Sequence, residues 1–201
     1  MDYQAILARV LATVDDKAYL TPAAHIDDHN RDALVVVQKK LQEKETSAAE
    51  IRLLIESLFR EGQLDEVHYL SALHVVAASP KVADYREAAR LVAEQEVVAL
   101  ELGGPNLNEN LASVDRHRGV LSFLQGHYEI ALAYFTRTLE RQRSPENIGN
   151  ILCALIRLGE EDEARALLNQ LSTGLSAPFL HALYQRIQQD PDLVNLRHEV
   201  D

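Results

Sequence analysis

Apolar residues recur at helical spacing along most of the chain. Between 128 and 139, Tyr128, Ala131, Leu132, Phe135 and Leu139 fall at positions i, i+3, i+4, i+7 and i+11. This spacing places them on one face of a helix and leaves polar residues on the other face. Similar stripes, with capping and turn residues between them, predict helices near 2–20, 28–41, 48–61, 66–77, 80–102, 109–124, 127–142, 146–158, 161–172, 177–189 and 191–199.

The second half of the chain repeats itself. Gly126 recurs as Gly159 and Ala131 recurs as Ala164, each 33 residues later. A fixed period of this length, with a glycine turn between two helical stretches, is typical of stacked helical hairpins. The small alanine is expected where the two helices of a hairpin come closest. One turn later, the larger Phe135 is expected to fill the gap between neighbouring hairpins.

These positions resemble the consensus of the tetratricopeptide repeat family. The unit 112–145 carries the resemblance with Gly119, Gly126, Tyr128, Ala131, Phe135, Leu139 and Pro145. The unit 145–178 keeps Gly159, Ala164 and Leu168, but it has Leu152 at the small-residue position and Glu161 at the tyrosine position. The resemblance implies an all-α fold, in which antiparallel helical hairpins stack as a short right-handed superhelix.

The strongest break in the chain is Gly103-Gly104-Pro105-Asn106. All five lysines precede it and all nine basic residues after it are arginines. We therefore expect an N-terminal helical region with degenerate repeats over 1–102 and a repeat array over 107–201. The stretch 191–199 would serve as a capping helix. An array without polar end helices must cover its terminal faces, so a homo-oligomer is a further possibility.

Charge and composition narrow the class of partner. The formal net charge is −11, which argues against nucleic acid because such binding needs a basic surface. The longest apolar run, from Ile151 to Ile156, is far too short for membrane insertion. Cys153 is the single cysteine, so no disulfide forms within the chain. A reducing, cytoplasmic setting is the simplest expectation.

In the family that the chain resembles, the leading helices of the hairpins line a groove that receives a peptide. The resemblance assigns these positions to Arg116, His117, Val120, Phe123 and Leu124 in one unit, to Gly149, Asn150, Cys153, Ile156 and Arg157 in the next, and to Arg186 in a third. Arginine binds carboxylates and asparagine can bond a peptide backbone, so Arg116, Asn150 and Arg157 suit an acidic or C-terminal peptide end. Val120 and Arg116 depart from the residues of family members that clamp a terminal carboxylate. Cys153 also fits as a small packing residue, and solvated surface arginines would equally explain the charges.

One short segment has the spacing of a metal site. In a helix, His25 and His29 would share a face with Asp28 and offer three ligands to zinc or another divalent ion. The same residues, with Asp27, also fit a capped turn at a helix start.

The sequence thus predicts a non-enzymatic module that needs no cofactor and binds another protein or a peptide, as an adaptor or a co-chaperone. Two alternatives remain open: a bacterial secretion chaperone, and a metal-binding enzyme or sensor that uses His25, Asp28 and His29.

Overall fold

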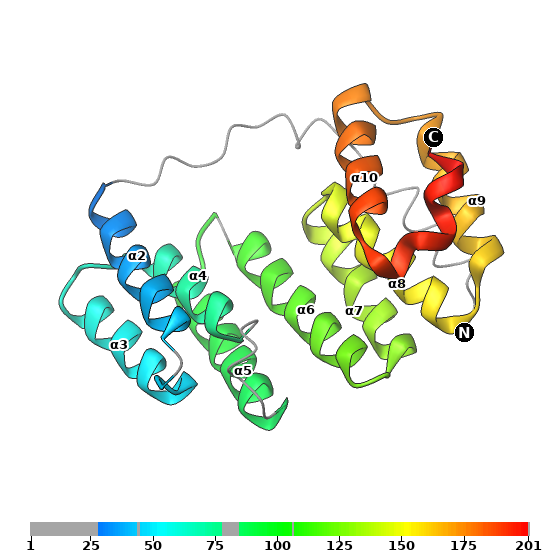
Figure 1. Cartoon of the computed structure of the whole chain (residues 1–201). Coiled ribbons are helices and arrows are strands. Elements are labelled where there is room, and N and C mark those ends of the chain that lie inside the picture. Colours follow the sequence, from blue (N-terminus) through cyan, green and yellow to red (C-terminus); the bar gives the residue numbers. More distant parts are fainter. Residues whose placement is uncertain (1–27, 44, 78–84, 106, 201) are drawn as a thin grey trace. The chain divides into compact units, whose positions relative to one another are not determined.

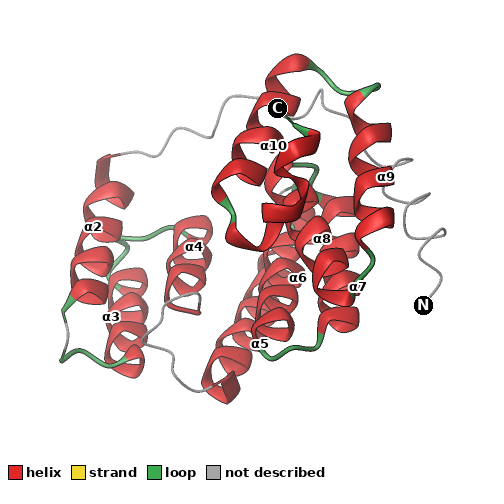
Figure 2. Ribbon diagram, turned by 45° about the vertical axis from the view of Figure 1, so that its right-hand side comes forward, coloured by secondary structure: helices red, strands yellow, loops and turns green. Residues whose placement is uncertain are grey.

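The structure is a computed structural model that describes residues 28–43, 45–77, 85–105 and 107–200. Every regular element in these ranges is a helix, and none of the described residues lies in a strand (Figure 2). The all-α class is therefore confirmed, while the predicted helix 2–20 lies outside the described residues. None of the described helices combines the length and the apolar character that crossing a membrane requires.

The chain forms two compact units, which we call the N-terminal and C-terminal units. Their described parts lie within 28–117 and within 118–200, so the division falls inside helix α6 (Leu107–Leu124). The sequence placed its boundary earlier, at 103–106. A break does occur there, because Gly103 and Gly104 have φ values of 55° and 72° just after α5 ends.

The N-terminal unit contains helices α2 to α5 and the first part of α6 (Figure 1). The helices are α2 (Asp28–Gln42), α3 (Ala48–Arg60), α4 (Glu66–Ala77) and α5 (Tyr85–Leu102). Helix α4 packs against α2, α3 and α5, and its buried face includes Leu70, Leu73 and Val76. A capping box starts α3: the Ser47 hydroxyl accepts from the Glu50 amide, and the Glu50 carboxylate accepts from the Ser47 amide.

The start of α4 is held to α2 by paired hydrogen bonds. The Asn30 amide nitrogen donates to Asp65 Oδ2 at 3.1 Å, and the Asp65 backbone amide donates to Asn30 Oδ1 at 2.9 Å. Asp65 Oδ1 also accepts from the His68 backbone and lies 2.7 Å from His68 Nδ1. His68 thus has a structural role at the start of this helix.

The C-terminal unit is arranged around α8 (Pro145–Leu158). Helix α8 packs against α7 (Tyr128–Arg141), α9 (Glu161–Ser172), α10 (Ala177–Gln189) and the 3₁₀ helix η2 (Pro191–Glu199). Residues 151–155 are all buried, so α8 is the centre of this unit. Its ends follow the sequence signals: the Ser144 hydroxyl caps the start, and Gly159, with a φ of 82°, ends the helix.

The last element differs from expectation in its geometry. Residues 191–199 form a 3₁₀ helix, in which side chains three positions apart lie above one another. Leu193 and Leu196 have this spacing and are fully buried against the core, whereas Val194 is exposed. The helix η2 packs on α8 and α10.

The packing of the hairpins rests on small residues at defined positions. Ala131 and Ala164 are both completely buried, as the repeat pattern requires. The tightest approach involves Gly119 of α6, where an added Cβ would lie only 2.4 Å from Phe135 Cε1 of α7. Phe135 therefore packs within its own hairpin, over Gly119, and does not only fill a gap between hairpins.

The second hairpin has different side chains at these two positions. The positions that correspond to Gly119 and Phe135 are Leu152 and Leu168, and both leucines are buried. A larger residue on the leading helix thus accompanies a smaller residue on the following helix.

We predict that Gly119→Ala destabilises the protein, although alanine is the better helix former. Helix propensity favours alanine by up to about 1 kcal/mol, but overpacking against the Phe135 ring costs about 1–3 kcal/mol. Urea denaturation should therefore show a lower free energy of unfolding for this variant.

Two comparisons isolate the contact with the ring. Gly174→Ala has no heavy atom within 4 Å of the new Cβ and should leave stability nearly unchanged. In a Phe135→Leu background, Gly119→Ala should be neutral or stabilising, because the ring is gone. A Gly119→Ala variant as stable as the parent chain in the presence of Phe135 would show that this contact does not limit the packing.

Candidate functional site

A small pocket opens between the leading helices of the C-terminal unit. We call it the inter-helix pocket; it has a volume of about 160 Å³ and is lined by Val120 and Phe123 of α6, Phe135 of α7, Asn150 and Cys153 of α8, Arg186 of α10, and Asp190 and Asp192 at and after the end of α10. This volume corresponds to about five water molecules and suits one inserted side chain. Val120, Cys153 and Arg186 are spaced 33 residues apart, so one repeat position contributes from three successive leading helices.

One side of the inter-helix pocket is apolar. Val120 and Phe123 are partly buried and pack against the core of the C-terminal unit. The Phe123 ring also contacts the Tyr128 ring edge-on, with centroids 5.2 Å apart. Together with the buried Phe135 ring, these side chains form a wall that excludes water from one side of an inserted group.

The opposite side is polar and is organised by Arg186. Its Nη2 donates to Asp190 Oδ2 at 3.0 Å and to Asn150 Oδ1 at 3.3 Å. The side chain lies along α8, because an added Cβ at Gly149 would come within 3.0 Å of Arg186 Cγ. Gly149 thus makes room for the arginine, which holds the polar side of the pocket in place.

The two aspartates have structural as well as electrostatic roles. Asp190 Oδ1 accepts from the Asp192 backbone amide at 2.9 Å and so caps η2. Asp192 in turn pairs with Arg157 of α8. The rim therefore carries two arginine–aspartate pairs whose charges balance, although the whole chain is acidic.

Cys153 faces this polar side but is chemically protected. Burial, together with the negative charge of Asp190, raises the pKa of the thiol to about 12. The Sγ atom lies 3.8 Å from Asp190 Oδ2, as expected for a thiol that donates a weak hydrogen bond. A protonated thiol is a poor nucleophile and a poor metal ligand, so Cys153 acts here as a small polar wall residue.

Cys153, Asp190 and Asp192 nevertheless offer ligand atoms within 4.8 Å of one another. A cation at this point would compete with Arg186 and Arg157, which already neutralise the two carboxylates. It would also require loss of the thiol proton. The geometry therefore favours an ion-paired pocket wall over a metal centre. The other predicted metal segment contains His25, which lies outside the described residues, and the structure describes no side-chain positions for Asp28 and His29.

The structure brings together most of the sequence-predicted groove residues, but not all. Val120, Phe123, Asn150 and Cys153 line the inter-helix pocket, and Arg157 stands at its rim through Asp192. Arg116 and His117 belong to the N-terminal unit and are not among the lining residues.

His117 is a buried core residue. Only 5% of the side chain is exposed, and its Nδ1 lies 2.9 Å from Gln95 Oε1 of α5. The Gln95 amide nitrogen continues this network by donating to the Leu70 carbonyl oxygen at 3.3 Å. The groove role that the family resemblance gave to His117 does not fit this position, because the ring is used to satisfy a buried glutamine.

Three residues that line the inter-helix pocket were not predicted as site residues: Phe135, Asp190 and Asp192. Phe135 was predicted as a core residue, and in the structure it both packs in the core and lines the pocket. The aspartates flank Pro191: Asp190 had the capping preference of aspartate before a helix that begins with proline as its only signal, and Asp192 had no such signal.

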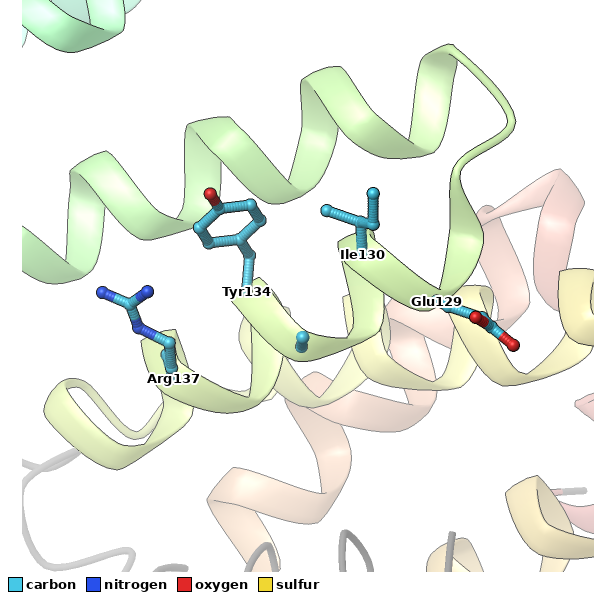
Figure 3. Close-up of a pocket in the computed structure, with 5 residues that line it drawn as sticks. Glu129, Ile130, Tyr134 and Arg137 are labelled. Carbon is cyan, nitrogen blue, oxygen red and sulfur yellow. The ribbon is translucent and has the colours of Figure 1, made fainter. Parts of the chain in front are cut away.

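A second hollow, of about 360 Å³, lies along α7. It is lined by Glu129, Ile130, Ala133, Tyr134 and Arg137. Figure 3 shows Ile130, Tyr134 and Arg137 projecting from one side of this helix. The Arg137 guanidinium lies 5.6 Å from the Tyr134 ring centroid, a cation–π contact that holds both side chains against the helix surface.

No family model matches the chain, and neither a curated protein nor a solved structure matches it significantly.

We predict that the Cys153 thiol resists alkylation in the folded protein. At pH 8, a thiol with a pKa near 12 has on the order of a thousandfold less thiolate than an unfolded cysteine with a pKa of about 8.5. Iodoacetamide should therefore label the chain slowly in buffer and rapidly in urea, as followed by mass spectrometry. Labelling at equal rates in the two conditions would contradict the protected geometry.

The same pKa shift predicts a loss of stability at alkaline pH. Below about pH 8.5 the thiol is protonated in both states, so its contribution is fully present. As the pH rises towards 12, the unfolded chain loses the proton and the folded chain keeps it, which favours unfolding. Cys153→Ala should lose less stability between pH 8 and pH 10 than the parent chain, and an identical pH slope in the two proteins would refute this assignment.

Proposed function

We propose that the protein is a non-enzymatic, tetratricopeptide-type binding module that holds a segment of another protein in the inter-helix pocket. The observation that carries this proposal is the alignment of Val120, Cys153 and Arg186, one repeat position on three successive leading helices, around one cavity. Leading helices that share a concave surface are what this family uses to receive peptides, and the resemblance of 112–145 to its consensus supports the same use here.

The lining residues indicate what such a segment would contain. The apolar wall and the volume of about 160 Å³ suit one medium-sized apolar side chain. Asn150 uses its Oδ1 to accept from Arg186, which leaves its amide nitrogen as a donor for a peptide carbonyl. Arg157 is about half exposed and engages Asp192 through Nη2, so its remaining donors can meet a carbonyl or a carboxylate.

This chemistry fits an adaptor or a co-chaperone more closely than an enzyme. The one nucleophilic side chain in the pocket is a protonated thiol, and each carboxylate is held by an arginine. The proposed mechanism is therefore recognition by shape and a few directed hydrogen bonds, in a protein that we place in the cytoplasm.

The test is selection from a random peptide display library, followed by affinity measurement on the enriched peptides. The parent protein should enrich sequences with one recurring apolar residue. Asn150→Ala combined with Arg157→Ala should weaken their binding by about tenfold or more, because a hydrogen bond from a charged group such as Arg157 contributes about 1.5–3 kcal/mol and a neutral one from Asn150 about 0.5–1.5 kcal/mol.

The matched control removes the same residue types elsewhere. Arg60 on α3 and Asn169 on α9 are exposed, and their double alanine variant should bind the selected peptides like the parent chain. Equal loss in both double variants, or a selection that enriches no common sequence, would refute the proposed pocket.

A further inference from the structure

Helix α5 is apolar on two faces, although only one of them is used inside the N-terminal unit. Ala88, Leu91, Val92, Gln95 and Ala99 are buried there, at the spacing of a single helical stripe. A helix with one buried face is expected to be polar on its exposed side. Val97 and Leu100 are instead 54% and 57% exposed.

We call this exposed face of the helix the α5 stripe. It consists of Arg90, Ala93, Val97, Leu100 and Glu101. At 100° per residue, these five positions fall within an arc of about 100° on the helix surface. Ala93, Val97 and Leu100 form its apolar centre. Arg90 and Glu101 stand at its two ends and are both exposed.

The two terminal charges cannot pair with each other in one chain. They are eleven residues apart, which is about 16 Å along the helix at a rise of 1.5 Å per residue. Neither forms an ion pair within the described part of the chain. Glu94, a partly buried acid between them in sequence, pairs with Arg52 of α3 at 3.4 Å.

We propose that the α5 stripe is the contact surface of a homodimer in which two copies of α5 pack antiparallel. A twofold axis between Gln95 and Glu96 would bring Arg90 of each copy beside the partner's Glu101, and Val97 beside the partner's Ala93. Leu100 would then cover the aliphatic stem of the partner's Arg90. A small residue opposite a branched one allows the helices to approach closely.

Charge complementarity favours a second copy of α5 as the partner and favours its antiparallel orientation. A parallel pair would place Arg90 against the partner's Arg90 and Glu101 against the partner's Glu101, which is repulsive. The antiparallel pair satisfies both charges twice, and it does so with a second copy of the same surface. The interface is confined to one helix per copy, so it is small, and the dimer is weak and dissociates on dilution.

The inferred dimer is independent of the proposed peptide site. The α5 stripe belongs to the N-terminal unit, and the inter-helix pocket belongs to the C-terminal unit. Either can fail in experiment while the other holds.

The experiment is a charge-swap series on the full chain, measured by sedimentation equilibrium over a wide concentration range. The parent chain is expected to show a monomer–dimer equilibrium in the micromolar range. Arg90→Glu and Glu101→Arg should each weaken the dimer by about tenfold or more, because each places like charges at both ends of the interface. The double variant Arg90→Glu/Glu101→Arg should restore dimerisation.

Mixing the two single variants gives the sharpest result. A chain with Arg90→Glu carries only acids at the two positions, and a chain with Glu101→Arg carries only bases, so the mixture should form heterodimers. Native mass spectrometry with one isotope-labelled variant would detect them. Arg60→Glu on the 78%-exposed Arg60 of α3 changes the net charge equally and should leave the dimer unaffected.

Two outcomes would overturn the inference. One is a parent chain that stays monomeric at every concentration. The other is a dimer that responds to Arg60→Glu as strongly as to Arg90→Glu, or that the mixed variants fail to restore. Circular dichroism of each variant would show whether its helices are intact, and Val97→Glu provides a second disruption that does not depend on the charge pair.

Discussion

The close approach of α6 and α7 at Gly119 is the constraint on which the geometry of the C-terminal unit depends. The Phe135 ring occupies the space in which any side chain at position 119 would stand. This contact fixes the separation of the two helices, and it also places the Phe135 ring at the wall of the inter-helix pocket. The ring that packs α7 against α6 is therefore also part of the pocket surface, to which α6, α8 and α10 contribute further residues.

Arg186 performs the corresponding task on the other side of α8. Its stem lies over Gly149, its guanidinium joins Asn150 to Asp190, and Asp190 caps η2. The cap, the last helix and the central helix are therefore connected through one side chain. Gly149 leaves space for the Arg186 side chain, as Gly119 leaves space for the Phe135 ring. A glycine therefore supports the polar wall of the pocket in one place and the apolar wall in the other.

Local chemistry explains how much of this could be predicted from the sequence. The left-handed Gly126 and Gly159 end helices where the repeat pattern placed its turns, and the capping box of Ser47 and Glu50 likewise depends only on residues a few positions apart. The burial of Ala131 and Ala164 follows from periodicity alone. Contacts between residues far apart in the sequence were harder to predict. The pairing of Arg157 with Asp192 spans 35 residues and depends on how η2 returns over α8, which no short motif encodes.

His117 shows why a repeat correspondence can mislead at the start of an array. It occupies the position that Asn150 holds 33 residues later, yet it bonds Gln95 of the preceding helix and is buried. The first member of a repeat series faces whatever precedes it, whereas later members face another copy of the repeat. The period therefore predicts the residue's place on its helix correctly but not the surface that this helix face meets.

The two surfaces inferred here differ in how they use charge, and this difference follows from pairing. At the inter-helix pocket each carboxylate already has an arginine, so the local field is small and selectivity must come from cavity shape and individual donors. On the α5 stripe Arg90 and Glu101 are held apart by the rigid helix between them, so their charges remain available to a partner and define its direction. Charged side chains that pair within their own unit help to form the pocket wall. Arg90 and Glu101 cannot reach each other along the helix, so they can determine how a second copy binds.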